Sequence, residues 1–218
     1  CTEVKQHNTF YASKLVKLSS RHYAFLAANE MEFTPTREQM LGNTMAEIAL
    51  DGVEQEVGGS VEFGKYKIVF NADGVHVDDN IWCFEHKYLF KGQPDPWKLQ
   101  SAAAQLLFYT ALASLKRGDY LKTGLYKRSQ VKHVFLPEDK DMIMCLVVTL
   151  PDKVVCWIHK PTKLELAKAL NFYLRKSDGI KNAVAYNWDD VNKWDEKFKR
   201  KEHLEFFPKL GIEDFKVF

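Results

Sequence analysis

Hydrophobic and polar residues alternate most regularly in the second quarter of the chain. The pattern predicts β-strands over residues 66–77 and 81–88, separated by turn-forming residues at 78–80. On the second strand, Glu85 and Lys87 fall on one face, about 7 Å apart along the strand. The other face is aromatic and can pack into a core. The polar pair is therefore held in place by a buried strand.

The length of the turn decides which side chains meet across the two strands. A three-residue turn, with Asn80 in the left-handed conformation, pairs Val77 with Ile81. This register sets Asp73 directly opposite Glu85, with Cβ atoms about 5 Å apart. A two-residue turn would move Asp73 to the other face of the sheet. The longer turn, or a bulge of equal effect, therefore brings two carboxylates together.

A long helix follows this pair of strands. Asp95 is placed to cap its start, and Gly118 lies just beyond its end. Residues 102–115 are apolar almost all round, which predicts a buried helix. Gln105 is the one large polar side chain in that run, and it shares a face with Tyr109. A buried amide needs partners, either the carboxylates, a nucleic acid or neighbouring backbone.

The remaining pattern predicts an alternation of helices and strands, and hence an α/β fold with about five strands and helices on both sides. Further helices are predicted over residues 9–28, 36–57, 161–176 and 188–203. Further strands are predicted over residues 60–70 (a hairpin about Gly64), 119–130, 142–150 and 154–159.

Composition limits the class of protein. The chain has 218 residues, 46% of them hydrophobic, which is enough for one good core, so we expect a single domain over residues 1–218. No apolar run reaches membrane length and no signal peptide is visible, so we expect no membrane partner. Four cysteines without metal-ligand spacing favour reduced thiols in a cytoplasmic, reducing compartment. Because the sequence begins at Cys1 rather than a methionine, we expect further residues before it.

The acidic pair predicts a cation site. Asp73 and Glu85 would repel each other at this distance unless a cation lay between them. Oxygen ligands suit a hard ion, Mg²⁺ or Mn²⁺. Lys87 could position or help to deprotonate an attacking water, or neutralise charge on a phosphate. The alternative is a surface ion pair between Glu85 and Lys87. Two other E-x-K sequences begin at Glu3 and Glu138, and neither follows a strand that bears an aspartate.

Together, Asp73, Glu85-His86-Lys87 and the Gln105-x-x-x-Tyr109 pair resemble the RecB-like branch of the PD-(D/E)XK nuclease superfamily. The resemblance covers residues 10–175 and implies a restriction-endonuclease-like core, with residues 176–218 as a helical elaboration. It implies Mg²⁺- or Mn²⁺-dependent hydrolysis of DNA, exonucleolytic in type, in repair or recombination. It also implies that the His86 backbone carbonyl is a further metal ligand, and that Gln105 and Tyr109 shape the site.

Two positions depart from the family pattern. Family members often carry Gly and then His-Glu on a helix that lends a metal ligand; here Ala46 replaces the histidine. We expect Glu47 as a third acidic ligand, with Glu54 as the alternative. Members with an iron–sulfur cluster have one cysteine near the start and three near the end of the chain. Here serines occupy the first position and the last cysteine is Cys156, so no cluster is expected.

The densest basic stretch before the C-terminus follows the long helix. It could line a phosphate track for single- or double-stranded DNA, or it could be a solvated strand edge. Its residues are Lys116, Arg117, Lys122, Lys127 and Arg128. Three other functions stay open: a sequence- or structure-specific endonuclease, a nucleic-acid-binding protein without turnover, and an unrelated α/β protein with a chance motif.

Overall fold

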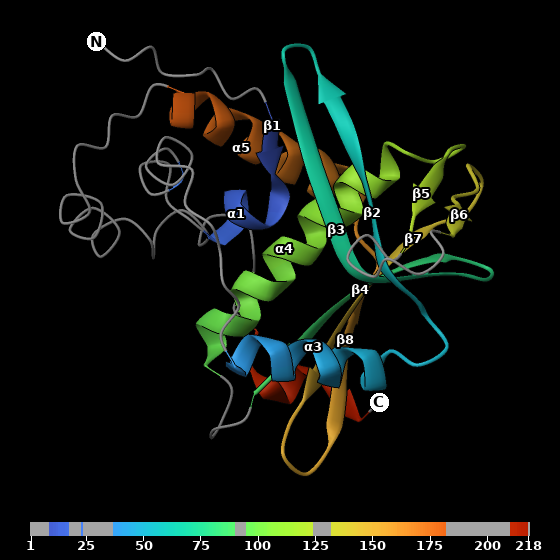
Figure 1. Cartoon of the computed structure of the whole chain (residues 1–218), viewed down its shortest axis with the longest axis vertical. Helices are drawn as coiled ribbons and strands as arrows, with labels where there is room; N and C mark the ends of the chain where they lie inside the picture. The colour runs from blue at the N-terminus through green and yellow to red at the C-terminus, as the bar shows by residue number, and fades with distance from the viewer. Residues whose placement is uncertain are drawn as a thin grey trace, which may run out of the picture.

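A single mixed β-sheet organises the molecule. The computed structural model describes residues 9–17, 23, 37–89, 95–123, 132–181 and 210–217. Across these residues nine strands follow the order β6-β5-β2-β3-β4-β7-β8-β9, with β1 paired to β3 (Figure 1). The strands are β1 Thr9–Tyr11, β2 Glu54–Phe63, β3 Tyr66–Val77, β4 Ile81–Tyr88, β5 Tyr120–Lys122, β6 His133–Phe135, β7 Met142–Thr149, β8 Val154–His159 and β9 Lys216–Val217. The helices are α1 Ala12–Lys17, α3 Arg37–Ala49, α4 Pro96–Ser114 and α5 Lys163–Lys181, and a 3₁₀ turn spans Ile212–Asp214.

The sheet combines parallel and antiparallel pairs. β4 and β7 run parallel at its centre, as do β1 and β3, whereas the other neighbours are antiparallel. This mixed sheet with flanking helices confirms the predicted α/β class. The expected number of about five strands is wrong. β1, β5, β6 and β9 have only two or three residues each, too few to show an alternating pattern.

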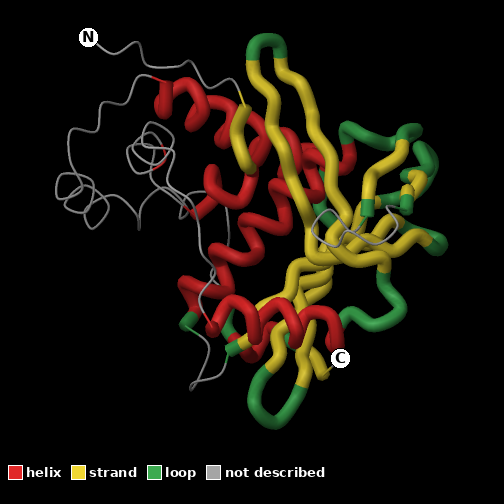
Figure 2. The backbone as a smooth tube through the Cα atoms, in the orientation of Figure 1, coloured by secondary structure: helices red, strands yellow, loops and turns green. Residues whose placement is uncertain are grey.

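The two central hairpins match the sequence pattern closely. β3, β4, β7 and β8 occupy the predicted segments, and the β2–β3 hairpin turns at Gly64, whose φ is 56°. Glycine adopts this left-handed conformation without the steric cost that a Cβ atom brings. Figure 2 shows this long hairpin reaching past the helices at one end of the sheet.

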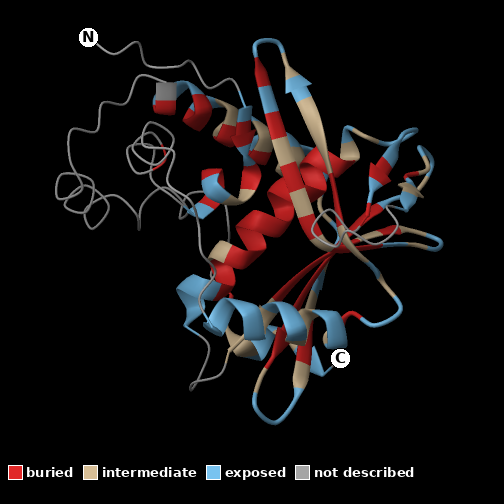
Figure 3. Ribbon diagram, in the orientation of Figure 1, coloured by how far each residue is buried: buried red, intermediate tan, exposed pale blue. Residues whose placement is uncertain are grey.

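Both faces of the sheet are covered at its centre. All eight residues of β7 are buried (Figure 3). Met144 and Leu146 belong to the main core with α4, whereas Cys145 and Val147 pack with Leu50, which follows α3, on the opposite face. α4 and α3 therefore lie on opposite sides of the strands β4 and β7.

The long helix α4 forms as its sequence predicts. Asp95 caps its start, with the side chain accepting a hydrogen bond of 3.0 Å from the Trp97 N–H. Beyond its end, Gly118 has a φ of 82°. Between these ends the helix is buried almost continuously from Leu99 to Ala113. It is the centre of the main core, and it packs against α5 and α1 as well as the sheet.

Two predicted helices are wrong at their boundaries. The predicted helix 9–28 begins instead as strand β1, and the structure describes helix only over α1 and at Tyr23. The predicted helix 36–57 ends at Ala49, because the chain then enters β2, where Val57 is fully buried opposite Ala72. Tertiary packing here overrides the helical pattern of the acidic residues.

Near the C-terminus the agreement is partial. α5 runs to Lys181, past the predicted end at 176. Of the predicted strand 119–130 the structure describes β5, and residues 124–130 lie outside the described part of the chain. The predicted helix 188–203 also lies outside it. None of the described helices is both long enough and apolar enough to cross a membrane.

Candidate active site

The β3–β4 turn sets the register that the site needs. Val77 pairs with Ile81, and the ladder continues to Gly74 opposite Phe84. Asp73 and Glu85 are the next residues on each strand, just beyond the last paired residues of this ladder. The predicted three-residue turn and its register are therefore confirmed.

The turn is stabilised differently from the prediction. Among the described residues, Glu56 is the only non-glycine residue with a positive φ, so Asn80 is not left-handed. Instead, the Asp78 carboxylate accepts hydrogen bonds from the Asn80 N–H at 2.8 Å and from the Trp82 indole at 3.0 Å. A side-chain cap of this kind satisfies the turn without a strained residue.

Asp73 is fixed by the backbone of the neighbouring strand. Its Oδ2 atom accepts a hydrogen bond of 2.7 Å from the His86 N–H. The side chain is partly exposed, so this bond is what limits its rotation. Its other oxygen, Oδ1, has no hydrogen-bond partner among the residues that the structure describes.

Glu85 is a buried carboxylate with one oxygen satisfied. Only 1% of the residue is exposed. Its Oε1 atom accepts hydrogen bonds from Lys87 Nζ and, at 2.8 Å, from Gln105 Nε2. Its Oε2 atom is buried and has no hydrogen-bond partner in the described part of the chain. Burial, and then repulsion from Asp73, raise the pKa of Glu85 to about 7.

Lys87 remains charged although it lies against the core. Burial alone would lower its pKa, but attraction to Glu85 and Asp73 outweighs burial and raises it. The side chain is 29% exposed, and its ammonium group donates to the buried Glu85 Oε1 atom. A protonated lysine donates hydrogen bonds but cannot accept a proton. As an ammonium group Lys87 is suited to positioning a water or a phosphate, and the predicted help in deprotonating the water stays a prediction.

Gln105 and Tyr109 support Glu85 from behind. Gln105 Nε2 donates to the Tyr109 hydroxyl at 3.0 Å as well as to Glu85. The two residues are only 4% and 3% exposed. Burial, then the charges of Glu85 and Asp73, raise the pKa of Tyr109 well above its usual range, so it stays a phenol. Both side chains are buried and contact Glu85 or each other. The contact with the substrate that the sequence predicted stays a prediction.

The His86 side chain points away from the site. Its Nε2 atom lies 2.8 Å from Thr149 Oγ1 on β7, and both residues are buried. Burial lowers the pKa of His86 to about 4, so the imidazole is neutral. The backbone of His86, which binds Asp73, is the part that belongs to the site. Thr149 is a supporting residue that sequence reasoning missed, because a threonine at the end of an apolar strand carries no distinguishing pattern.

The predicted third acidic ligand does not join the pair. Glu47 is exposed on α3, which packs on the opposite face of β4 from Glu85. Glu54, its alternative, begins β2 and is also exposed. Within the described ranges, no three His, Cys, Asp or Glu residues come together as a metal-binding group. The structure therefore brings together two carboxylates and not three.

Two of the predicted basic residues have partners outside the Asp73–Glu85 pair. Lys116 forms an ion pair of 3.1 Å with Asp119, and Arg117 donates a bond of 2.9 Å to the Lys140 carbonyl. Lys122 is exposed on β5. Lys127 and Arg128 lie outside the described residues.

The donor set fits a hard divalent cation. Asp73 and Glu85 supply carboxylate oxygens from adjoining strands, and the buried Glu85 Oε2 atom lacks any donor of its own. A buried anionic oxygen without a partner is costly, and a cation would remove that cost. We use the name catalytic cluster, after the function proposed below, for Asp73, Glu85, Lys87, Gln105 and Tyr109.

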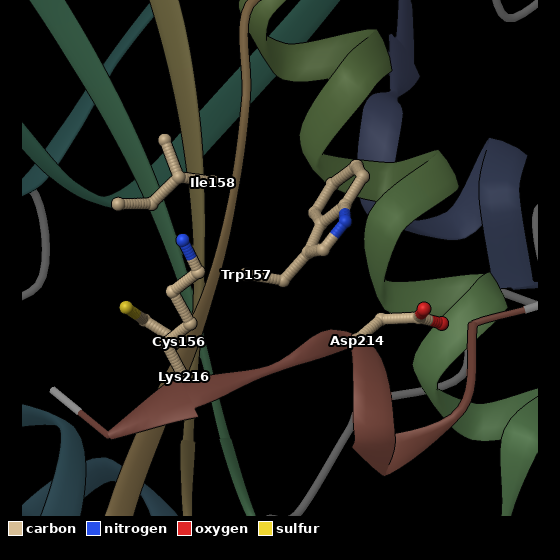
Figure 4. Close-up of a pocket in the computed structure, with 5 residues that line it drawn as sticks. All are labelled: Cys156, Trp157, Ile158, Asp214 and Lys216. Carbon is tan, nitrogen blue, oxygen red and sulfur yellow. The ribbon is translucent and has the colours of Figure 1, made fainter.

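A separate pocket lies at the β8–β9 edge of the sheet and has a volume of about 250 Å³. Figure 4 shows its lining residues, Cys156, Trp157, Ile158, Asp214 and Lys216. It shares no residue with the catalytic cluster.

Comparison with known proteins adds information on the fold. No family model matches the sequence. No curated protein matches it either. Among solved structures, the crystal structure of SSO0001 is similar, with a TM-score of 0.50 and 20% identity over 90% of this chain and 88% of that one. At this identity the likeness concerns the fold alone, and it extends over nearly the whole length of both chains.

Proposed function

We propose that the chain is a Mg²⁺- or Mn²⁺-dependent deoxyribonuclease that hydrolyses DNA phosphodiester bonds, of the exonucleolytic type that the resemblance to RecB-like nucleases implies. The observation that carries this proposal is the convergence of Asp73, Glu85 and Lys87, with the Glu85 Oε2 atom buried and without a donor. A surface ion pair, the alternative for an E-x-K sequence, would not bury its carboxylate to 1% exposure.

Each side chain of the catalytic cluster has a distinct task in this proposal. Asp73, Glu85 and the His86 carbonyl would hold the cation, which when bound activates water and stabilises charge on the phosphoryl group. Lys87, held as an ammonium, donates hydrogen bonds to the attacking water or to a phosphate oxygen. Gln105 and Tyr109 keep Glu85 in one rotamer, because a misplaced ligand costs rate steeply.

A reducing intracellular compartment suits this chain. The cysteines at positions 83, 145 and 156 are free and buried in the core. Burial raises the pKa of Cys83 and of Cys145 to about 12, so both remain unreactive thiols. DNA within such a compartment is the substrate that we propose.

The direct test uses end-labelled single- and double-stranded DNA with Mn²⁺, with Mg²⁺ or with EDTA. We expect cleavage with either metal, none with EDTA, and none by an Asp73→Asn variant that folds like the wild type. A covalently closed circular DNA in the same series separates exonuclease from endonuclease, because only an endonuclease cuts it. DNA that is bound but never cut by the wild type, with either metal, would contradict the proposal and indicate a binding protein.

A further inference from the structure

The short helix α1 lies against the catalytic cluster. It contacts α4 and β3, the elements that carry Gln105, Tyr109 and Asp73. Its Ser13 hydroxyl hydrogen-bonds to Tyr109, which accepts from Gln105, which in turn donates to Glu85. Ser13 therefore fixes one face of α1 onto the chain of bonds that ends at the buried carboxylate.

Lys17 lies on that same face. It follows Ser13 by four residues, which is one helical turn and about 6 Å along the axis. The residue is exposed overall, so a substrate can reach it, although enough protein surrounds its ammonium group to desolvate it in part. Desolvation, and then repulsion from Lys87, lower the pKa of Lys17, while Glu85 and Asp73 attract it. Lys87, Glu85 and Asp73 belong to the catalytic cluster, so the charge of Lys17 lies at the edge of that cluster.

The charge of Lys17 is not required to neutralise the two carboxylates. Lys87 already binds Glu85, and a divalent cation would offset the remaining negative charge of the pair. Within the described part of the chain, no carboxylate lies within ion-pair distance of Lys17. An accessible ammonium group at a site that is already neutralised attracts an anion from solution, and a phosphodiester is the anion that the proposed reaction supplies.

We infer that Lys17 is a second substrate-binding cation, which binds the phosphate next to the scissile one while Lys87 serves the reacting phosphate. This inference rests on the proposed nuclease function. It makes α1 part of the substrate site, and Ser13 the positioning residue that docks α1 onto Tyr109.

The chain offers a matched control on the same helix. Lys14 is exposed like Lys17, but its ammonium group lies over the ring of Tyr11, 5.4 Å from the centroid. Lys14→Gln and Lys17→Gln each remove one positive charge from the same helix. Lys14 lies away from the catalytic cluster, whereas Lys17 lies beside it. Lys17→Arg retains the charge.

The experiment measures two quantities for each variant. Binding of a fluorescein-labelled single-stranded oligonucleotide in EDTA is followed over a range of NaCl concentrations, and kcat and KM are measured with Mn²⁺. For Lys17→Gln we expect KM and Kd to rise about 10-fold, as for the loss of one charge-assisted hydrogen bond. The slope of log K against log salt should fall by about 0.7, the value for one phosphate of a single strand. Lys17→Arg should restore most of the affinity, and Lys14→Gln should match the wild type.

The results that would contradict the role of Lys17 differ from the result that would contradict the nuclease proposal. If the wild type cuts DNA but Lys17→Gln behaves like Lys14→Gln, this inference is wrong and the nuclease proposal stands. If Lys17→Gln and Lys17→Arg are equally impaired and both melt at a lower temperature, Lys17 has a structural role and the inference is again wrong. If the wild type cuts no DNA with either metal, the proposed function itself fails.

Discussion

At the scale of single residues, the molecule keeps a carboxylate where carboxylates are rarely found. Glu85 is 1% exposed and is retained by two hydrogen bonds to the same oxygen, from Lys87 and Gln105. A buried charge is tolerated when it is paired and hydrogen-bonded, but replacing such a pair by apolar residues is often neutral or stabilising. Glu85 therefore has no advantage for stability alone, which favours a chemical role.

Lys87 provides the sharpest test of that role. A preorganised hydrogen-bond donor to developing charge contributes about 10²- to 10³-fold to rate, so Lys87→Ala should lower kcat by about that factor. KM should change less, because the reacting phosphate carries more negative charge in the transition state than in the bound substrate. The measurement is steady-state cleavage of labelled DNA with Mn²⁺. Lys98→Ala, an exposed lysine at the start of α4, is the control and should keep full activity. Unaltered turnover by Lys87→Ala would remove Lys87 from the mechanism.

Metal binding should also be visible without any substrate. A cation that binds only the folded chain stabilises it by about 2.7 kcal/mol at a concentration 100 times its Kd. We therefore expect the melting temperature to rise with added Mn²⁺ and to return to its starting value with EDTA. In Asp73→Asn the rise should be lost, because one of the two carboxylates is gone. An equal rise in both proteins would place the cation elsewhere.

At the scale of elements, helix starts are defined by side-chain caps. The N–H and hydroxyl of Thr162 donate to Glu165 Oε2 at 2.7 and 2.8 Å, and the Glu165 N–H donates to the Thr162 hydroxyl at 3.2 Å. This reciprocal arrangement is a capping box at the start of α5. His159 on β8 binds the other Glu165 oxygen at 3.0 Å. The cap thereby ties α5 to the sheet.

This cap makes part of the stability dependent on pH. Burial would raise the pKa of Glu165, but its bonds to Thr162 and His159 outweigh burial and lower it. Because the folded pKa lies below the unfolded one, the stabilisation is present above about pH 4.5 and is lost as the pH falls through the folded value. Urea unfolding should show Glu165→Gln to be less stable by about 0.5 kcal/mol at pH 7, allowing for solvent screening. The difference should shrink at pH 3. Asp152→Asn, in the exposed β7–β8 turn, should show neither effect.

The elements that sequence could predict are those with long, regular patterns. β3, β4, β7 and α4 have eight or more residues each, with either a regular alternation or a continuous apolar run, and the register of the β3–β4 hairpin followed from the turn length. The end of α3 could not be predicted, because the acidic residues after it suit a solvated helix as well as the start of β2. The packing of α3 on the sheet places Glu47 on the opposite face from the carboxylate pair. Lys17 was missed, and Ser13 was given no role, because the position of both residues depends on how α1 docks.

At the scale of the whole molecule, α4 lies between the sheet and α5. One side lies on the sheet and another packs on α5, where the rings of Phe108 and Tyr173 lie 4.3 Å apart between centroids. Both residues are fully buried. The sequence predicted that α4 is buried, but not what covers it, since an apolar helix surface does not specify its neighbour.

The contact between α4 and α5 should dominate the effect of core substitutions. Phe108→Ala removes a fully buried ring and should lower the free energy of unfolding by about 3–5 kcal/mol. Leu164→Ala, at a position on α5 that is 63% exposed, should change it by less than about 0.5 kcal/mol. Guanidinium denaturation of both variants tests this comparison. Similar values for the two would show that α5 contributes little to the core.

The burial of α4 has a consequence for how the protein would lose its chemistry. Gln105 and Tyr109 project from the innermost helix, so no local opening can release them while the remainder stays folded. Denaturant should therefore abolish turnover and far-ultraviolet ellipticity at one common midpoint. Slow amide exchange along this helix would likewise show that the reactive centre opens only when the entire protein unfolds.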